Sequence, residues 1–81
     1  MRILGFVASG CGPCTQQRPI WAALPVPVEI IDVDLEPDLR EKYGVEGLPT
    51  TLVLSGDDVT TALRGLSTTR EILEALGSAV A

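Results

Sequence analysis

Histidine is missing from this chain and basic residues are few, which removes several classes of function. The 81 residues include six Lys and Arg against eleven Asp and Glu, a net charge of −5, and the basic residues are scattered. Nucleic acids and anionic membranes bind clustered positive charge, so we expect neither as a partner. A zinc or iron–sulfur site normally takes four Cys or His ligands. With two cysteines and no histidine we expect no metal.

Long apolar runs are also missing. No stretch approaches the roughly 20 residues of a membrane span, and no basic segment leading into an apolar run follows Met1. We therefore expect a cytoplasmic protein without signal peptide or anchor, in a compartment where paired cysteines are more often catalytic than structural. The length predicts one domain over residues 1–81, and the shortage of aromatics predicts an aliphatic core. We expect the domain to act as a monomer.

The two cysteines that are present lie close together, in Cys11-Gly12-Pro13-Cys14. Residues 2–8 before them are apolar and predict a buried strand. Pro13 suits the first turn of a helix, where no N–H partner is needed. Cys11 should therefore lie at a helix N-terminus, where free N–H groups and the helix dipole favour a thiolate. Cys14, about one turn later, can attack a disulfide formed at Cys11.

A structural role for the pair is the competing interpretation. A disulfide stabilises chiefly by closing a long loop, and a loop this short constrains almost nothing. Two unrelated buried cysteines would not be expected to flank Gly-Pro at a strand–helix junction. The spacing therefore favours a redox pair.

The remaining patterns predict a β-α-β-α-β-β-α order. After the first strand we expect a helix over 11–23 that contains Pro19, a buried strand over 26–33, a short helix opening at 36–38 and capped by Gly44, strands over 50–55 and 59–64 joined as a hairpin, and a helix over 68–81.

Helical spacing also predicts which side chains face the core. The inward faces are expected to hold Cys14, Ile20, Trp21 and Leu24 in the first helix, Leu39 and Tyr43 in the second, and Ile72, Leu73, Leu76, Ala79 and Val80 in the third. Trp21 should pack the first helix against the sheet. Thr68 and Glu71 have the spacing of a capping box.

A Cys-x-x-Cys motif after the first strand of a βα pattern is the mark of a thioredoxin-like redox centre. The chain resembles the thioredoxin family in more than this motif. Pro19, five residues after Cys14, matches the kink in the family's helix. Residues 42–50, which end in Gly47-Leu48-Pro49-Thr50, resemble the family's stretch with a cis-proline, and Gly65 matches a glycine beside its active site.

The resemblance implies an α/β fold of the thioredoxin-like class, with a four-stranded mixed sheet between helices. Because the chain begins at the strand before the motif, the first strand and helix of a full-length thioredoxin would be absent. The remaining domain would have the size of a glutaredoxin.

The resemblance also implies an enzyme, a protein-disulfide reductase that donates electrons to reductive enzymes. Cys11 and Cys14 would be its catalytic residues, with Gly12 and Pro13 as supporting residues of the motif. Cys11 would attack the substrate disulfide and Cys14 would resolve the mixed disulfide. An NADPH-linked thioredoxin reductase would recycle the oxidised pair, and no bound cofactor would be needed beyond this redox-active disulfide.

Substrate binding follows from the same resemblance. A cis Pro49 would present the backbone of Leu48 to an extended substrate strand. Gly65 and Leu66, together with the two residues between the cysteines, would complete a shallow apolar groove.

Three departures from the family concern proton transfer and the surface beside the cysteines. Gly10 replaces a tryptophan, Gly5 replaces a buried aspartate in the first strand, and Ile30 replaces its companion lysine. The proton of Cys14 would then pass to water entering beside Gly5 or to the leaving thiolate.

Two other functions remain open. The size fits a glutaredoxin-like reductase that depends on glutathione, although the Gly-Pro between the cysteines and the few basic residues argue against it. From another class, the chain could be a thioredoxin-fold binding subunit without turnover.

Overall fold

A computed structural model describes the backbone of residues 1–80 and the side chains as far as Gly77. The elements follow the predicted order: β1 (Arg2–Val7), α1 (Gly12–Ala22), β2 (Val28–Asp32), α2 (Pro37–Lys42), β3 (Thr50–Ser55), β4 (Asp58–Arg64) and α3 (Thr69–Val80). None of these helices is both long and apolar enough to cross a membrane.

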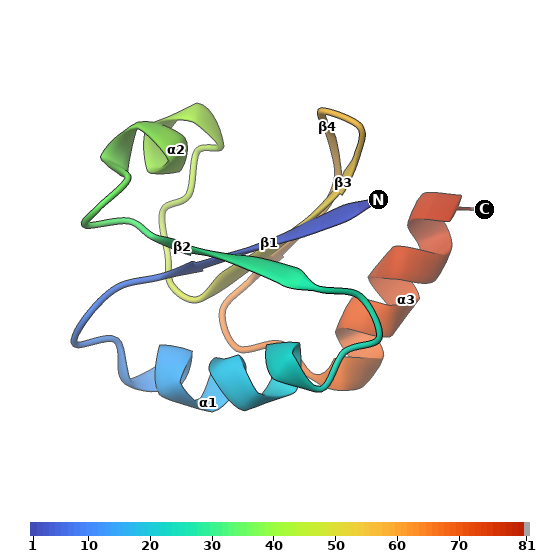
Figure 1. Cartoon of the computed structure of the whole chain (residues 1–81), viewed down its shortest axis with the longest axis horizontal. Helices are drawn as coiled ribbons and strands as arrows, with labels where there is room; N and C mark the ends of the chain where they lie inside the picture. The colour runs from blue at the N-terminus through green and yellow to red at the C-terminus, as the bar shows by residue number, and fades with distance from the viewer. Residues whose placement is uncertain (81) are drawn as a thin grey trace.

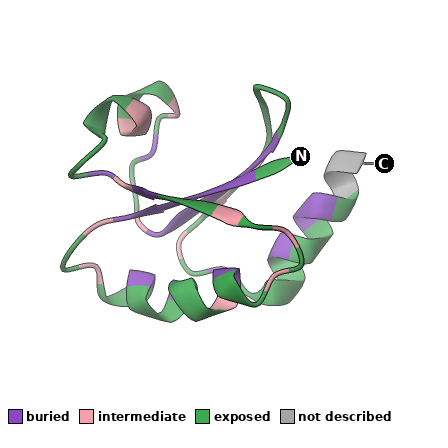
Figure 2. Cartoon of the chain, viewed as in Figure 1, coloured by how far each residue is buried: buried purple, intermediate pink, exposed green. Residues whose placement is uncertain are grey.

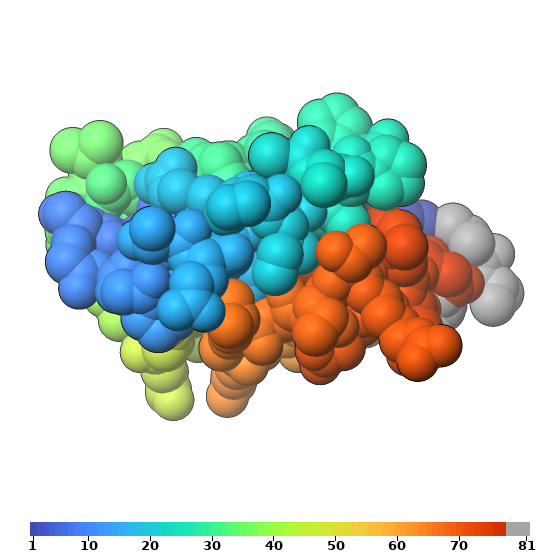
Figure 3. Space-filling view, turned by 90° about the horizontal axis from the view of Figure 1, so that it is seen from below, coloured from blue at the N-terminus to red at the C-terminus, as the bar shows by residue number. Residues whose placement is uncertain are grey.

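The four strands form one mixed sheet in the order β2-β1-β3-β4. β1 runs parallel to β2 and antiparallel to β3, which forms an antiparallel hairpin with β4. Helices α1 and α3 lie on one side of the sheet and α2 lies on the other (Figure 1). The predicted four-stranded sheet between helices is confirmed. The chain that leads into α3 lies directly beside α1, as the view from below shows (Figure 3).

Alternation along the two central strands divides the core into two clusters, because successive side chains of a strand face opposite sides. The cluster under α1 and α3 contains Ile3, Val7, Cys14, Trp21, Val53, Ile72, Ala75 and Leu76. The cluster on the α2 side contains Leu4, Phe6, Ile31, Val33, Val45, Leu52 and Leu54. The buried residues accordingly concentrate along β1 and β3, while the outer faces of the helices are exposed (Figure 2).

The prediction of a second buried strand over 26–33 is wrong in extent and in burial. Regular pairing covers only Val28–Asp32, and within it only Ile31 is buried, while Ile30 is 41% exposed. The cause is non-local: β2 lies at the end of the sheet and has a single strand neighbour, β1. An apolar run does not distinguish such an edge strand from a central one.

The helix faces also differ in detail from the prediction. Leu73 is 42% exposed, and the buried stripe of α3 is Ile72, Ala75 and Leu76, which follow the i, i+3, i+4 rule. The predicted Ala79 and Val80 fall outside the described side chains.

The expected buried stripe of α2 is likewise only partly buried. Leu39 and Tyr43 cover the edge of the second cluster rather than joining it, because this short helix lies over the end of the sheet. Tyr43 is the C-terminal cap of α2 and meets Phe6 edge-on, with ring centroids 6.0 Å apart.

Local sequence patterns predicted these helix ends correctly. Gly44 has a φ of +62° and follows α2, as a C-terminal glycine should. At the start of α3 the Thr68 N–H donates to Glu71 Oε1 at 3.0 Å, and the Glu71 N–H donates to Thr68 Oγ1 at 3.1 Å. This reciprocal pair is the predicted capping box.

Candidate functional site

Cys11 and Cys14 are joined as a disulfide at the start of α1, with their Cα atoms 5.3 Å apart. Cys11 is the N-cap residue, in an extended conformation, and its Sγ accepts a hydrogen bond from the Cys14 N–H at 3.2 Å. Pro13 lies in the first turn, where its missing N–H costs nothing. The predicted position of Cys11 at a helix N-terminus is confirmed.

The two sulfurs differ in exposure. The Cys14 side chain is only 2% exposed and belongs to the cluster under α1. Cys11 is half-buried at the edge of that cluster, and both Gly12 and Pro13 are exposed. A large molecule that approaches the pair therefore meets Cys11 first.

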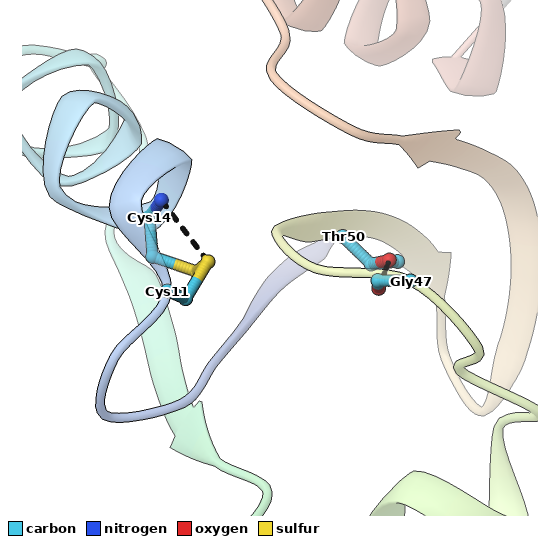
Figure 4. The surroundings of a disulfide bond; sticks show 4 residues. All are labelled: Cys11, Cys14, Gly47 and Thr50. Atoms are coloured by element: carbon cyan, nitrogen blue, oxygen red, sulfur yellow. Dashed lines mark hydrogen bonds between the residues drawn. A yellow bond between two sulfur atoms is a disulfide. The ribbon is translucent and has the colours of Figure 1, made fainter.

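The loop before β3 lies opposite the disulfide (Figure 4). It is braced by a hydrogen bond from Thr50 Oγ1 to the Gly47 carbonyl at 2.7 Å. Between them the Leu48–Pro49 peptide bond is cis. Leu48 is half-buried and contacts both core clusters, whereas the Pro49 ring is fully buried. This loop consequently offers its backbone and the edge of Leu48, but not the proline ring, to the surface.

A second loop, residues 65–67, adjoins the first. The Gly65 N–H donates to the Pro49 carbonyl at 2.8 Å, and Gly65 has a φ of +81°, which a residue with a side chain rarely adopts. Leu66 beyond it is 48% exposed. The four residues that the resemblance implied for substrate binding therefore come from two neighbouring loops that one hydrogen bond joins.

Gln17 is a buried polar residue that the sequence interpretation missed. Its side chain is fully buried on the inward face of α1, one turn after Cys14. Its Nε2 donates to the Ser67 carbonyl at 3.0 Å, and its Oε1 accepts from the Ser67 N–H at 2.7 Å. The spacing from Cys14 to Gln17 to Trp21 follows an inward stripe and was the available signal. Because glutamine is mostly exposed in proteins, burial of Gln17 was not expected from the sequence.

Trp21 occupies the space beside Gly5. A Cβ atom on Gly5 would lie 2.7 to 2.9 Å from three carbons of the indole ring. The ring is anchored by its Nε1–H, which donates to Thr51 Oγ1 at 3.0 Å. The expectation that water enters beside Gly5 is therefore wrong, because the indole fills this space. The prediction that Trp21 packs α1 against the sheet is confirmed.

No ionisable acid or base is buried near Cys14 in the described part of the chain. The buried polar side chains there are Gln17, Thr50, Thr51 and Ser67, none of which titrates in the ordinary range. Among the described residues, too, no group of three or more His, Cys, Asp and Glu side chains gathers as a metal site would require. The reactive groups that the structure brings together at this site are the two sulfurs.

Comparison with known proteins adds the family context. The thioredoxin family model matches residues 1–78. The SPbeta prophage-derived thioredoxin-like protein YosR of Bacillus subtilis is 31% identical over 61 residues, which cover 73% of this chain and 76% of that protein. Thioredoxin of Rhodospirillum rubrum is 37% identical over 60 residues, 67% of this chain and 58% of that protein. The chain thus spans less than two thirds of the Rhodospirillum protein.

Among solved structures, a mutant thioredoxin from Halobacterium salinarum superposes with a TM-score of 0.84. That superposition covers 94% of this chain and 71% of the other, at 28% identity. The Malassezia sympodialis thioredoxin superposes with a TM-score of 0.80 over 93% of this chain and 71% of its own, at 20% identity, which supports the fold alone.

Proposed function

The chain belongs to the thioredoxin family, and from that premise we propose that it is a thiol–disulfide oxidoreductase that reduces disulfides in other proteins. The observation that carries the proposal is the arrangement of the cysteine pair, with half-buried Cys11 at the N-cap of α1 and Cys14 buried behind it. An accessible first thiol can attack a substrate disulfide, and a second thiol behind it can then resolve the mixed disulfide.

In the first step the Cys11 thiolate attacks one sulfur of the substrate disulfide. The substrate S–S bond breaks, one substrate thiolate leaves and takes a proton from solvent, and a mixed disulfide with Cys11 remains. The start of α1 supports the thiolate through the positive end of the helix dipole. The Cys14 N–H, which lies 3.2 Å from Cys11 Sγ in the oxidised protein, supplies a donor toward the same charge.

In the second step Cys14 loses its proton and attacks Cys11 Sγ. The mixed disulfide breaks, the second substrate thiolate leaves, and the Cys11–Cys14 disulfide forms, so that two electrons have passed to the substrate. Since the indole ring fills the space beside Gly5, we assign the proton of Cys14 to the departing substrate sulfur, which accepts it as the new S–S bond forms and the mixed disulfide breaks. Burial raises the pKa of a thiol, so this step is the demanding one.

Substrate recognition uses the two loops beside the sulfurs. We assign docking of an extended substrate segment to the Leu48 backbone and to the exposed side chain of Leu66. We assign reduction of the Cys11–Cys14 disulfide after each cycle to an NADPH-linked thioredoxin reductase. We also propose that the protein acts as a monomer in the cytoplasm.

Insulin reduction tests the proposal directly. The protein is supplied with NADPH and a thioredoxin reductase in one arm, and with glutathione and glutathione reductase in the other. We expect turnover in the first arm. Turnover confined to the second would replace the proposal with the glutathione-dependent function, and none in either would favour a binding subunit.

Trapping provides the complementary measurement. The Cys14→Ser variant should accumulate mixed disulfides at Cys11 with cellular proteins, because no resolving thiol remains. Thr15→Ser, which changes the exposed neighbour of Cys14, is the matched control and should trap none. Equal trapping by both variants would contradict the assigned roles.

A further inference from the structure

The contact between Gln17 and Ser67 joins two parts of the site that the sequence separates by 50 residues. It consists of two hydrogen bonds, at 3.0 and 2.7 Å, both in the buried interior. The amide group thus pairs with the whole backbone unit of Ser67, its N–H and its carbonyl. Such a pair fixes orientation as well as distance, because rotation of either partner breaks one bond.

This contact completes the bracing of the 65–67 loop. On one side of Leu66, the Gly65 N–H is bonded to the Pro49 carbonyl at 2.8 Å. On the other side, Ser67 is bonded to Gln17 through both of its backbone polar groups. Leu66 is therefore held between two tethered neighbours, while its own side chain remains 48% exposed. Gln17 ties this exposed apolar residue to the same face of α1 that carries Cys14.

Ser67 is buried, so its backbone N–H and carbonyl need hydrogen-bond partners, and Gln17 supplies both. An aliphatic side chain of similar volume would fill the same space but would leave both backbone groups of Ser67 without this partner. What the amide adds is a fixed position for the backbone of the loop.

We propose that Gln17 is a positioning residue for substrate recognition, acting through Ser67 to hold Leu66 at the rim of the cysteine pair. This inference rests on the proposed function, since it concerns the binding of protein disulfides by the same site. It assigns to Gln17 no contact with the substrate and no role in the exchange of electrons.

The test compares Gln17→Met with Gln16→Met. Methionine has the length of glutamine without its hydrogen bonds, and Gln16 is the exposed neighbour of Gln17, with no side-chain hydrogen bond among the described residues. Each pre-reduced variant is mixed with insulin in single-turnover experiments that give the maximal rate and the half-saturating insulin concentration. A small substrate, hydroxyethyl disulfide, is measured in parallel.

For Gln17→Met we expect the half-saturating insulin concentration to rise roughly fivefold to tenfold, the effect of misplacing one apolar anchor. The maximal rate and the rate with hydroxyethyl disulfide should stay within about twofold of wild type, because the sulfurs are untouched. Gln16→Met should match wild type throughout. A folded variant that reacts more slowly with both substrates has lost thiol reactivity rather than substrate binding, and that result would overturn the inference.

A double-mutant cycle tests whether the effect passes through Leu66. Leu66→Ser should weaken insulin binding by itself, and adding Gln17→Met to it should change the half-saturating concentration less than about twofold. Independent residues would instead multiply their effects, which would refute the coupling. If Gln17→Met does not fold, Gln17→Asn takes its place. That variant keeps the amide but is one methylene shorter and reaches Ser67 less well, so the same separation between insulin and the small substrate is expected.

The proposed function and the positioning role of Gln17 fail differently. If wild-type protein does not reduce insulin, the proposed function is wrong. If wild-type protein reduces insulin and Gln17→Met equals Gln16→Met, only the positioning role is wrong.

Discussion

Replacing Gly5 with alanine should destabilise the protein, although alanine is the better residue for a strand. The added methyl would lie 2.7 to 2.9 Å from three ring carbons of Trp21. Carbon atoms pack at about 3.5–4.0 Å, so the ring would have to retreat by roughly 1 Å. It has little freedom to do so, because Trp21 is 2% exposed and its Nε1–H is held by Thr51.

The magnitude follows from two opposing effects. Overpacking of a core costs about 1–3 kcal/mol. Removing the backbone freedom of glycine from the unfolded chain returns about 0.5–1 kcal/mol, since Gly5 does not need a positive φ. The net loss is about 1.5 kcal/mol, near the middle of the resulting range. For a domain of this size that corresponds to a fall in Tm of about 6–12 °C.

Urea and thermal unfolding of the oxidised protein, followed by far-UV circular dichroism, measure this loss. Gly77→Ala is the matched control, because an added Cβ at Gly77 in α3 meets nothing within 4 Å. That variant should gain about 0.5–1 kcal/mol. In a Trp21→Leu background, Gly5→Ala should no longer be destabilising. A Gly5→Ala protein as stable as wild type, or more stable, would refute the claim that the indole ring fills this space.

Three further predictions concern the two sulfurs, the hydrogen bond between Trp21 and Thr51, and the ion pair between Arg2 and Glu29. Iodoacetamide should alkylate Cys11 of the reduced protein well before the buried Cys14, as peptide mass spectrometry can follow, and equal rates would reverse the assigned roles. Thr51→Val, which leaves the indole N–H without an acceptor, should cost about 1–3 kcal/mol in urea unfolding, and a neutral result would mean that the bond is not made. The Arg2 side chain donates a hydrogen bond to the Glu29 carboxylate at 2.9 Å and lowers the pKa of Glu29. The stabilisation from this ion pair is therefore present above the glutamate pKa of the unfolded chain and is lost as the pH falls through the pKa of Glu29 in the folded protein. Arg2→Met should return the Glu29 pKa, read by NMR titration, to its ordinary range, and an unchanged value would exclude this cause.

Features encoded by near neighbours in sequence could be predicted. The order of strands and helices, the helix start at Cys11 and the capping box at Thr68 each depend on residues within one turn of each other, and each is confirmed. The position of the cysteine pair at the end of β1 and the start of α1 was predictable for the same reason.

Three features that depend on distant segments could not be predicted from local patterns. The low burial of Ile30 follows from the strand order, which no local pattern contains. Gly5 was interpreted as a missing acid, and its match to the ring of Trp21 becomes visible only when β1 and α1 are packed together. Gln17 was missed because its partner, Ser67, lies 50 residues away. The sequence thus located the reacting sulfurs but not the residues that hold the surrounding loops in place.

The position of β2 at the end of the sheet also bears on solubility. An open strand edge is a template for pairing with other chains, and proteins protect such edges with charges, prolines and short strands. All three protections are present: β2 has five residues, Pro27 precedes it, and Glu29 interrupts its apolar residues. Glu29→Val would leave an uninterrupted β-branched run from Val28 to Ile31, a composition typical of aggregation-prone segments. Selection for solubility can therefore act on Glu29 independently of selection on the cysteines.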